Sequence, residues 1–210
     1  IRGEWIAPWG VAETDELGVR DVLVAAGGHY ITLHAEFGDG IDQDDGFANA
    51  GNLGFLPGIP GPMAIGHPAA CNALEQSAGE VGATVLRGVE GVVVIPGSPP
   101  SVSFSHDGTT QVASARLVVG ADGRNSTVRR KLGFELIEEP QHNWFSGLLV
   151  EDAHDWPEDT QTSGTHGDGH LLVFPQGKGR LRLYLGYATE QKSRLAGNDS
   201  ARAFLDAFDV

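Results

Sequence analysis

The chain has 210 residues, of which 40% are hydrophobic and 20% are charged, so it is long enough to bury a sizeable core. Its 28 acidic and 14 basic side chains give a net charge of −14, which repels nucleic acids and anionic membranes. The apolar runs are too short to cross a bilayer, and the single cysteine, Cys71, excludes an internal disulfide. No signal peptide is visible, and we expect a cytoplasmic protein that binds neither nucleic acid nor membrane.

Both ends of the sequence look cut. The chain starts at Ile1 without an initiator Met, and it closes in an amphipathic pattern, "SARAFLDAFDV", that lacks a Gly or Pro stop signal. We therefore expect the 210 residues to be the middle of a longer protein.

The first third of the chain predicts two helices. Residues 11–28 carry apolar residues at near-helical spacing and end at Gly27-Gly28, which predicts one helix with a glycine cap. Residues 32–65 are rich in Gly, Pro and acidic residues, and within them "GDGIDQDDG" (38–46) lacks the calcium-loop spacing, so we expect a solvated loop there. A second helix is predicted over 67–82.

The middle third predicts strands. Apolar runs lie at 83–89, 91–97 and 101–106, and Asp107-Gly108 predicts a tight hairpin turn before a returning strand over 111–122. These runs indicate a three-stranded meander near 84–114, followed by a short helix that stops at Gly133.

The last third reads as strands around an acidic loop. A strand is predicted over 142–151, a polar acidic loop over 151–170, and a long hairpin over 170–187. In the second arm of the hairpin, leucines alternate with Arg180, Arg182 and Tyr184, which is the period of a half-buried strand. Asp199 or Ser200 caps the closing helix.

A basic stretch, "VVGADGRNSTVRR" (118–130), stands out in this acidic chain. Val118 and Val119 are predicted to end a buried strand, Asp122-Gly123 to turn, and Ser126 to cap the next helix. Helix starts beyond strand ends favour phosphate, so the arginines suit a diphosphate, while the carboxylate suits a ribose hydroxyl or the loop's own N–H groups. The alternative is an ordinary strand, turn and helix with a solvated basic face.

The spacing Gly120-x-Asp122-Gly123-x-x-Ser126-x-x-Arg129 resembles the Asp-Gly fingerprint of FAD-dependent aromatic hydroxylases, the single-component flavoprotein monooxygenases. Stretches 2–23, 67–89 and 174–187 resemble the same family in the same order. The resemblance covers nearly the whole chain.

The resemblance implies an α/β fold. It implies an incomplete FAD/NAD(P)-binding Rossmann-like domain with a β-meander (1–31 and 66–139) and a partial antiparallel-sheet substrate domain (32–65 and 140–210). It further implies FAD as cofactor, NAD(P)H as co-substrate, and transfer of one oxygen atom from O2 to a small aromatic or similarly electron-rich substrate.

The resemblance also implies site residues. Those expected to bind the cofactor are Arg2, His67, Asp122, Gly123, Arg182 and Tyr184. Phe174 and Gln176 fall where the family contacts substrate, and Arg182 is expected to stabilise negative charge on the reduced flavin. No catalytic acid or base follows from the resemblance.

Three family features are not found: the Gly-x-Gly-x-x-Gly loop, the acidic residue that binds the adenosine ribose, and the later Gly-Asp motif. His67 also stands where the family usually has Arg or Gln. We therefore expect these 210 residues alone to hold FAD weakly and to be inactive.

Other functions remain open on the residues alone. A flavoprotein reductase or halogenase shares this scaffold, although neither Trp144 nor Trp156 lies in the halogenase segment Trp-x-Trp-x-Ile-Pro. A non-catalytic acidic module would bind a partner through residues 151–170.

Two smaller constellations allow other chemistry. His67 and Cys71 are spaced for a dyad, and His166, Asp168 and His170 for a metal, but the simpler interpretations are a core thiol and a polar loop tip, with no metal bound. Trp144, Phe145, Phe174 and Tyr184 suit either an aromatic pocket or sheet core.

Overall fold

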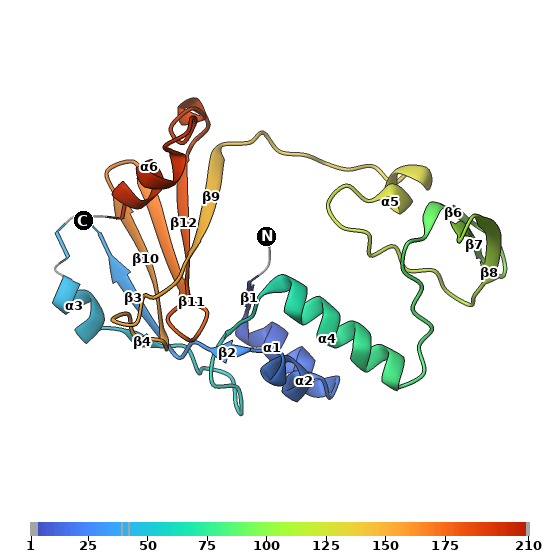
Figure 1. Ribbon diagram of the computed structural model, residues 1–210, viewed down its shortest axis with the longest axis horizontal. Coiled ribbons are helices and arrows are strands. Elements are labelled where there is room, and N and C mark those ends of the chain that lie inside the picture. Colours follow the sequence, from blue (N-terminus) through green and yellow to red (C-terminus); the bar gives the residue numbers. More distant parts are fainter. Residues whose placement is uncertain (1–3, 39, 42, 209–210) are drawn as a thin grey trace. The chain divides into compact units, whose positions relative to one another are not determined.

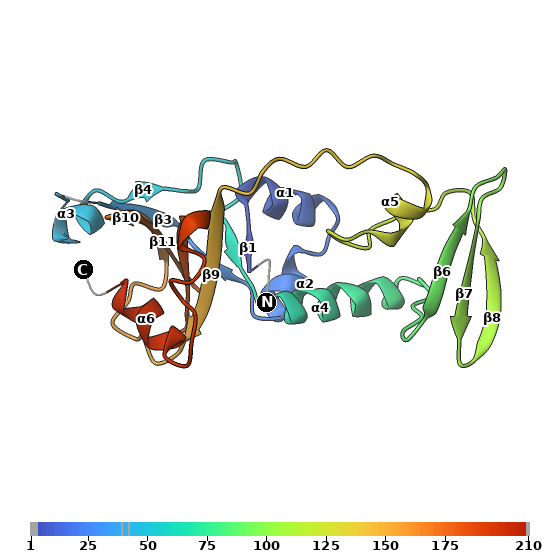
Figure 2. The ribbon, with the colours of Figure 1, turned by 90° about the horizontal axis from the view of Figure 1, so that it is seen from above.

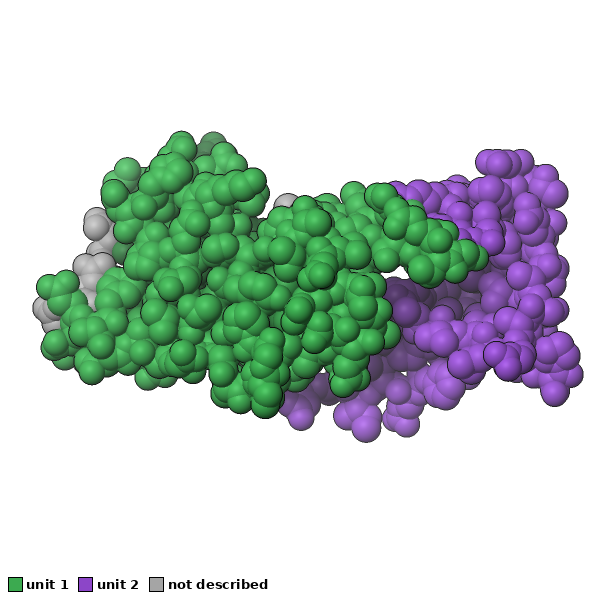
Figure 3. All heavy atoms as spheres, turned by 90° about the horizontal axis from the view of Figure 1, so that it is seen from below, with its two compact units in different colours: residues 1–82, 141–210 green, residues 83–140 purple. Residues whose placement is uncertain are grey.

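The computed structural model describes residues 4–38, 40–41 and 43–208. They fall into two compact units, coloured separately in Figure 3: one draws on residues 1–82 and 141–210, and the other on residues 83–140. Each unit is described by itself.

A six-stranded sheet dominates the first unit, with strand order β4-β3-β10-β11-β12-β9 (Figure 1). In that order, its strands are Gly51–Asn52, Leu33–Phe37, Thr160–His166, Gly169–Pro175, Leu181–Ala188 and Asn143–Val150. All neighbours are antiparallel except β3 and β10, which are parallel. The long hairpin of β11 and β12 confirms the prediction from alternating residues.

Two strands of this sheet correct the sequence analysis. Residues 160–166, predicted as part of an acidic loop, form β10, and β3 lies in the weakly periodic region. The segment "TQTSGTH" lacks large apolar residues, but β10 is paired on both sides, so its backbone bonds are satisfied and its β-branched threonines suit a buried strand. The predicted loop over 38–46 overlaps a helix, α3 (Gln43–Ala48).

One face of the sheet carries the larger core. Leu181, Leu183 and Leu185 of β12 alternate onto this face with Val173 of β11, and Phe204 of helix α6 (Ser200–Asp206) belongs to the same buried cluster. The alternation leaves Arg182 and Tyr184 on the opposite face. A 3-10 turn, Thr189–Gln191, follows β12.

The rest of the first unit is a small sheet with three helices (Figure 2). Its strand order is β1-β5-β2, with bounds Trp5–Ile6, Met63–Ala64 and His29–Tyr30. The helices are α1 (Pro8–Glu16), α2 (Arg20–Ala25) and α4 (His67–Glu80). The cluster that holds them together buries Val11, Leu23, Ile59, Met63 and Ile65.

The helix predicted over 11–28 is two helices. Gly18 has φ +70°, a left-handed conformation that ends α1 after Leu17, and α2 starts at Arg20. Val11 and Leu23 still share one core, which is why their spacing suggested a single helix. Gly27, with φ +102°, ends α2 as predicted, and α4 confirms the second predicted helix.

The second unit contains the predicted meander, β6-β7-β8, with bounds Glu90–Ile95, Ser101–His106 and Thr109–Ser114. The hairpin turn is at Asp107 (φ +51°) and Gly108 (φ +72°), the two positive φ angles that the Asp-Gly pair predicts. Helix α5 (Thr127–Lys131) follows, also as predicted.

Two other strand predictions in this unit are wrong. Residues 83–89 and 115–122 have no strand structure, and Leu117 and Val119 are about three-quarters exposed rather than buried. An apolar run becomes a strand only when a neighbour satisfies its N–H and C=O groups. No strand among the described residues pairs with either run.

Candidate functional site

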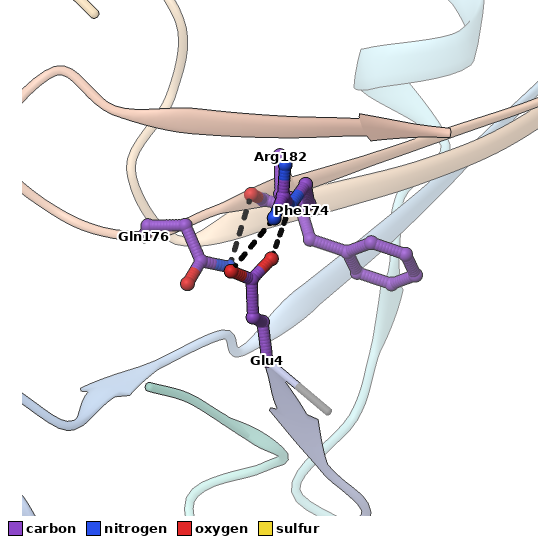
Figure 4. A network of polar contacts seen from close by, with 4 residues as sticks. All are labelled: Glu4, Phe174, Gln176 and Arg182. Atoms are coloured by element: carbon purple, nitrogen blue, oxygen red, sulfur yellow. Dashed lines mark hydrogen bonds and ion pairs between the residues drawn. The ribbon is translucent and has the colours of Figure 1, made fainter. Parts of the chain in front are cut away.

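The strand register of the first unit brings four predicted residues to one place. Phe174 pairs with Arg182, and Leu172 pairs with Tyr184, so Phe174, Arg182 and Tyr184 lie on the same sheet face. Gln176 follows at the end of β11; it is buried, and its Nε2 donates weakly to the Phe174 carbonyl (3.4 Å). Figure 4 shows Phe174, Gln176 and Arg182 beside Glu4.

Arg182 forms a buried ion pair that the sequence did not predict. Its Nε and Nη2 donate to the two carboxylate oxygens of Glu4, with 2.9 Å between Nη2 and Oε1 (Figure 4). The two residues are only 6% and 7% exposed. The hydrogen bonds to Glu4 raise the pKa of Arg182 although burial opposes the rise, so the guanidinium stays charged.

Aromatic rings cover the same face. The Phe174 ring lies 6.1 Å from Trp5 and 6.0 Å from Tyr184 between ring centroids. The Arg182 guanidinium lies 5.8 Å from the Tyr184 ring centroid. Burial, and then the Glu4 carboxylate, raise the pKa of the Tyr184 phenol, which therefore stays protonated at neutral pH.

A hydrogen-bonded chain runs from Trp5 across two strands. The Trp5 indole N–H donates to Oε1 of Gln161 (2.8 Å), and Nε2 of Gln161 lies 3.2 Å from Nδ1 of His34. Nε2 of His34 lies 3.1 Å from the Ser163 hydroxyl. Gln161 and His34 are register partners in β10 and β3, so the chain lies on the face of Phe174 and Arg182.

Sequence reasoning missed Glu4, Trp5, His34, Gln161 and Ser163. A local signal existed for His34 alone, since "LHAEF" alternates apolar and polar residues as a half-buried strand does. The others were missed because their contacts join residues 129 to 178 positions apart, which no local pattern encodes.

The other face of the sheet has a cavity of about 650 Å³, lined by apolar residues such as Trp156, Leu171 and Leu183. The Arg182 face differs from this cavity in carrying the buried Arg182–Glu4 pair and the chain from Trp5 to His34. Because buried polar groups and aromatic rings converge on the Arg182 face, that face is the candidate functional site.

The remaining first-unit predictions have different outcomes. Arg2 lies outside the described residues. His67 is exposed at the start of α4, and both of its ring nitrogens lie 3.7 Å from the Cys71 sulfur, which is also exposed. No third group that would orient a dyad is bonded to this pair in the described structure.

The "HGDGH" segment is a hairpin tip between β10 and β11. Asp168 accepts hydrogen bonds from Nε2 of Gln191 and from Nη1 of Arg194 (2.9 Å), which lower its pKa. The His170 ring packs edge-on against Phe145. Among the described residues, no three His, Cys, Asp or Glu side chains gather as metal ligands.

Asp122 and Gly123 lie in the second unit, where the carboxylate of Asp122 binds its own loop. It accepts from the Ser126 hydroxyl and from the N–H groups of Thr127 (2.6 Å) and Val128 (3.1 Å). The Ser126 hydroxyl in turn accepts from the Arg129 N–H (3.0 Å), the predicted cap. The hydrogen bond from Ser126, then that from Val128, lower the pKa of Asp122 to about 2.

The two glycines of this motif, Gly120 and Gly123, are required for different reasons. Gly123 has φ +79°, which favours glycine, and a Cβ on Gly120 would lie 2.7 Å from the Val128 side chain. The Arg129 guanidinium donates to the Arg124 carbonyl, and that of Arg130 to the Thr127 hydroxyl. The first N–H groups of α5 and the side chains of Arg129 and Arg130 therefore stabilise the loop itself.

Comparison with known proteins gives this geometry a context. The family described as "FAD binding domain" matches residues 15–200. A curated relative, 6-methylpretetramide 4-monooxygenase of Streptomyces rimosus, is 29% identical over 196 residues, which cover 87% of this chain and 34% of that protein. The chain thus spans about a third of that relative's length.

Solved structures share the fold. A flavoprotein/dehydrogenase from Cytophaga hutchinsonii has a TM-score of 0.83 at 16% identity, covering 99% of this chain and 52% of that one. PqsL of Pseudomonas aeruginosa, titled a probable FAD-dependent monooxygenase, has 0.69 at 20%, covering 97% and 60%. CmlS, a flavin-dependent halogenase, has 0.72 at 16%, covering 99% and 38%. No helix among the described residues is long and apolar enough to span a membrane.

Proposed function

The chain belongs to the FAD-binding-domain family, as its Asp-Gly fingerprint predicted, and from that premise we propose that the protein is an FAD-dependent monooxygenase of aromatic substrates. The observation that carries the proposal is the sheet face on which Trp5, Phe174 and Tyr184 surround the buried Arg182–Glu4 pair. Bound FAD, reduced by NAD(P)H, would supply the chemistry that passes one oxygen atom of O2 to the substrate.

The substrate class is proposed from the aromatic face and from the relatives. Trp5, Phe174 and Tyr184 pack into one aromatic wall, and such a wall can stack or pack edge-on against an aromatic ligand. One relative is named for 6-methylpretetramide, and PqsL has been crystallised with 2-aminobenzoylacetate. We propose a small aromatic substrate that contacts Phe174, with Gln176 at the edge of the site.

The residues present fit a bound FAD. Gly123 has open space where a Cβ would lie, so a ligand can approach the backbone there, whereas Gly120 makes room for the Val128 side chain of the same loop. Asp122 is proposed to serve FAD by fixing this loop rather than by contacting the diphosphate, because both of its carboxylate oxygens already accept hydrogen bonds. Arg2 and His67 remain proposed cofactor contacts.

Arg182 is proposed to act together with Glu4. Two of its three guanidinium nitrogens contact Glu4, so the site holds a neutral pair rather than a free positive charge. The pair ties β12 to Glu4, directly before β1, and it would place Glu4 and Tyr184 against the flavin. Stabilisation of reduced flavin by Arg182 would then depend on how Glu4 shares the charge.

The domain division is proposed on the same basis. All strands of the six-stranded sheet come from 32–65 and 140–210, the ranges proposed as the substrate domain. The ranges 1–31 and 66–139 are proposed as part of the FAD-binding domain. The acidic binding module loses support, because residues 160–166 of its proposed surface are paired on both sides.

Oxygen isotope labelling of the full-length protein tests the function. The protein is purified, its flavin spectrum recorded, and NAD(P)H oxidation followed under ¹⁸O₂ with 6-methylpretetramide, 2-aminobenzoylacetate and related phenols. We expect one ¹⁸O atom in the product of at least one compound. Chlorination in the presence of chloride would favour the halogenase that shares this fold, and a product gaining two hydrogens without ¹⁸O would favour a reductase.

A further inference from the structure

His34 lies in none of the motifs that point to flavin chemistry, yet it is the centre of the polar chain on the site face. Its ring nitrogens contact Gln161 on one side and Ser163 on the other. Its side chain is 26% exposed, while Gln161 is only 8% exposed. A buried carboxamide needs its partners fixed, because leaving it unpaired is costly.

The donors and acceptors of this chain can be assigned from chemistry alone. An indole N–H can only donate, so the oxygen of Gln161 must face Trp5 and its NH₂ must face His34. An NH₂ group can only donate as well, so Nδ1 of His34 must accept and carries no proton. The proton of the neutral imidazole therefore lies on Nε2 and is donated to the Ser163 hydroxyl.

We propose that His34, held as the Nε2–H tautomer, is a positioning residue that fixes Trp5 over the site through Gln161. If Nδ1 carried a proton, it would oppose the NH₂ of Gln161, and the carboxamide would have to turn and lose the Trp5 bond. Trp5 packs against Phe174, so His34 would set the spacing of the aromatic wall without touching the ligand. The consequence for substrate rests on the proposed function, whereas the tautomer and the Trp5 position do not.

Three variants separate the possibilities. His34→Asn keeps an oxygen acceptor near the place of Nδ1, whereas His34→Leu removes it. His170→Leu is the matched control: this histidine lies on β11 of the same sheet and contacts Phe145, outside the chain to Trp5. All are made in the full-length protein labelled with ¹⁵N at histidine and tryptophan.

The first readout is NMR and needs no substrate. We expect an unprotonated Nδ1 and a protonated Nε2 for His34, and a Trp5 indole N–H signal that shifts in His34→Leu, returns toward its original position in His34→Asn and is unmoved in His170→Leu. A protonated Nδ1 in the wild type, or an unchanged Trp5 signal in His34→Leu, would overturn the proposal. If His34→Leu does not fold, the wild-type tautomer and His34→Asn still decide.

The second readout is kinetic, with whichever aromatic compound takes up ¹⁸O. Loss of one buried hydrogen bond predicts a KM raised about fivefold in His34→Leu, with kcat changed less, and substantial recovery in His34→Asn. A fivefold fall of kcat at unchanged KM in His34→Leu would overturn the assignment of His34 to substrate positioning. If no compound is oxygenated, the proposed function fails while the NMR result stands by itself.

Discussion

The sheet face around Arg182 and the loop around Asp122 both place a carboxylate among hydrogen-bond donors, but they do so in opposite settings. Glu4 is buried and its partner lies 178 residues away, whereas Asp122 is exposed and bonds only to residues four to six positions ahead. The first carboxylate depends on the tertiary fold, and the second shapes a local turn.

The same contrast holds for the two units. Both buried hydrophobic clusters belong to the first unit, whereas in residues 83–140 apolar side chains such as Val112, Leu117 and Ile137 are largely exposed. The strands and turns of the second unit follow local rules without a core beneath them. A sequence therefore specifies hairpins and caps locally, while a buried site needs several strands in the right order.

The largest effect is expected at the buried ion pair. Arg182→Met and Glu4→Gln each leave one charged or polar group buried without its partner, and each should lower the free energy of unfolding by about 3–5 kcal/mol. Urea unfolding of the full-length protein measures this. We also expect Arg182→Ala to bind FAD more weakly or to reduce the flavin more slowly, and stopped-flow absorbance measures the reduction rate.

The double variant Arg182→Met with Glu4→Gln sharpens that result. Because the double variant buries neither of the two charges, it should be more stable than the Arg182→Met protein, which still buries the Glu4 carboxylate. If the losses of unfolding free energy in the two single variants simply add in the double variant, the two residues do not interact. If FAD affinity and reduction rate are also unchanged, the pair has no role in the site.

Gly123 offers a smaller effect in the local loop. Its φ of +79° makes alanine strained by about 1–2 kcal/mol, and the loop should respond by loosening FAD more than by unfolding the protein. Gly88→Ala is the matched control, since Gly88 has φ +71° in the same unit and also has open space around its Cβ. In an FAD titration, the alanine variant of Gly123 should bind FAD more weakly than Gly88→Ala. Equal losses of FAD affinity in the two variants would show a general effect of backbone strain.

Asp122 predicts a pH dependence with a definite sign. Its folded pKa of about 2 lies below the ordinary value of 3.8, so its contribution to the loop is complete above about pH 4 and is lost as the pH falls toward 2. The Thr127 and Val128 amide hydrogens should lose protection against hydrogen exchange across that range.

The Asp122→Ala variant should already lack this protection at pH 7, with weaker FAD binding and little change in Tm. A large Tm shift at normal FAD affinity would point to a purely structural role.

The sequence analysis was most reliable where a structure is local. The Asp107-Gly108 turn, the β11–β12 alternation and the Ser126 cap are each confirmed, because a few adjacent residues decide them. The strand β10 was missed because threonines replace apolar residues in it. The Glu4–Arg182 pair and the Trp5–Gln161–His34 chain could not be predicted, because they join residues 127 to 178 positions apart in the chain.

The most direct test of the site is whether substrate binds the Arg182 face rather than the cavity behind it. The ligand is the aromatic compound that takes up ¹⁸O. Its Kd is measured from changes in the visible flavin spectrum for the wild type, Phe174→Ala and Leu171→Ala. Phe174 lies on the Arg182 face, and Leu171 lines the cavity on the other face. Loss of one aromatic contact predicts a Kd raised about tenfold in Phe174→Ala. The Kd of Leu171→Ala should stay near that of the wild type. A weakened Leu171→Ala beside an unchanged Phe174→Ala would contradict this placement and move the site to the cavity.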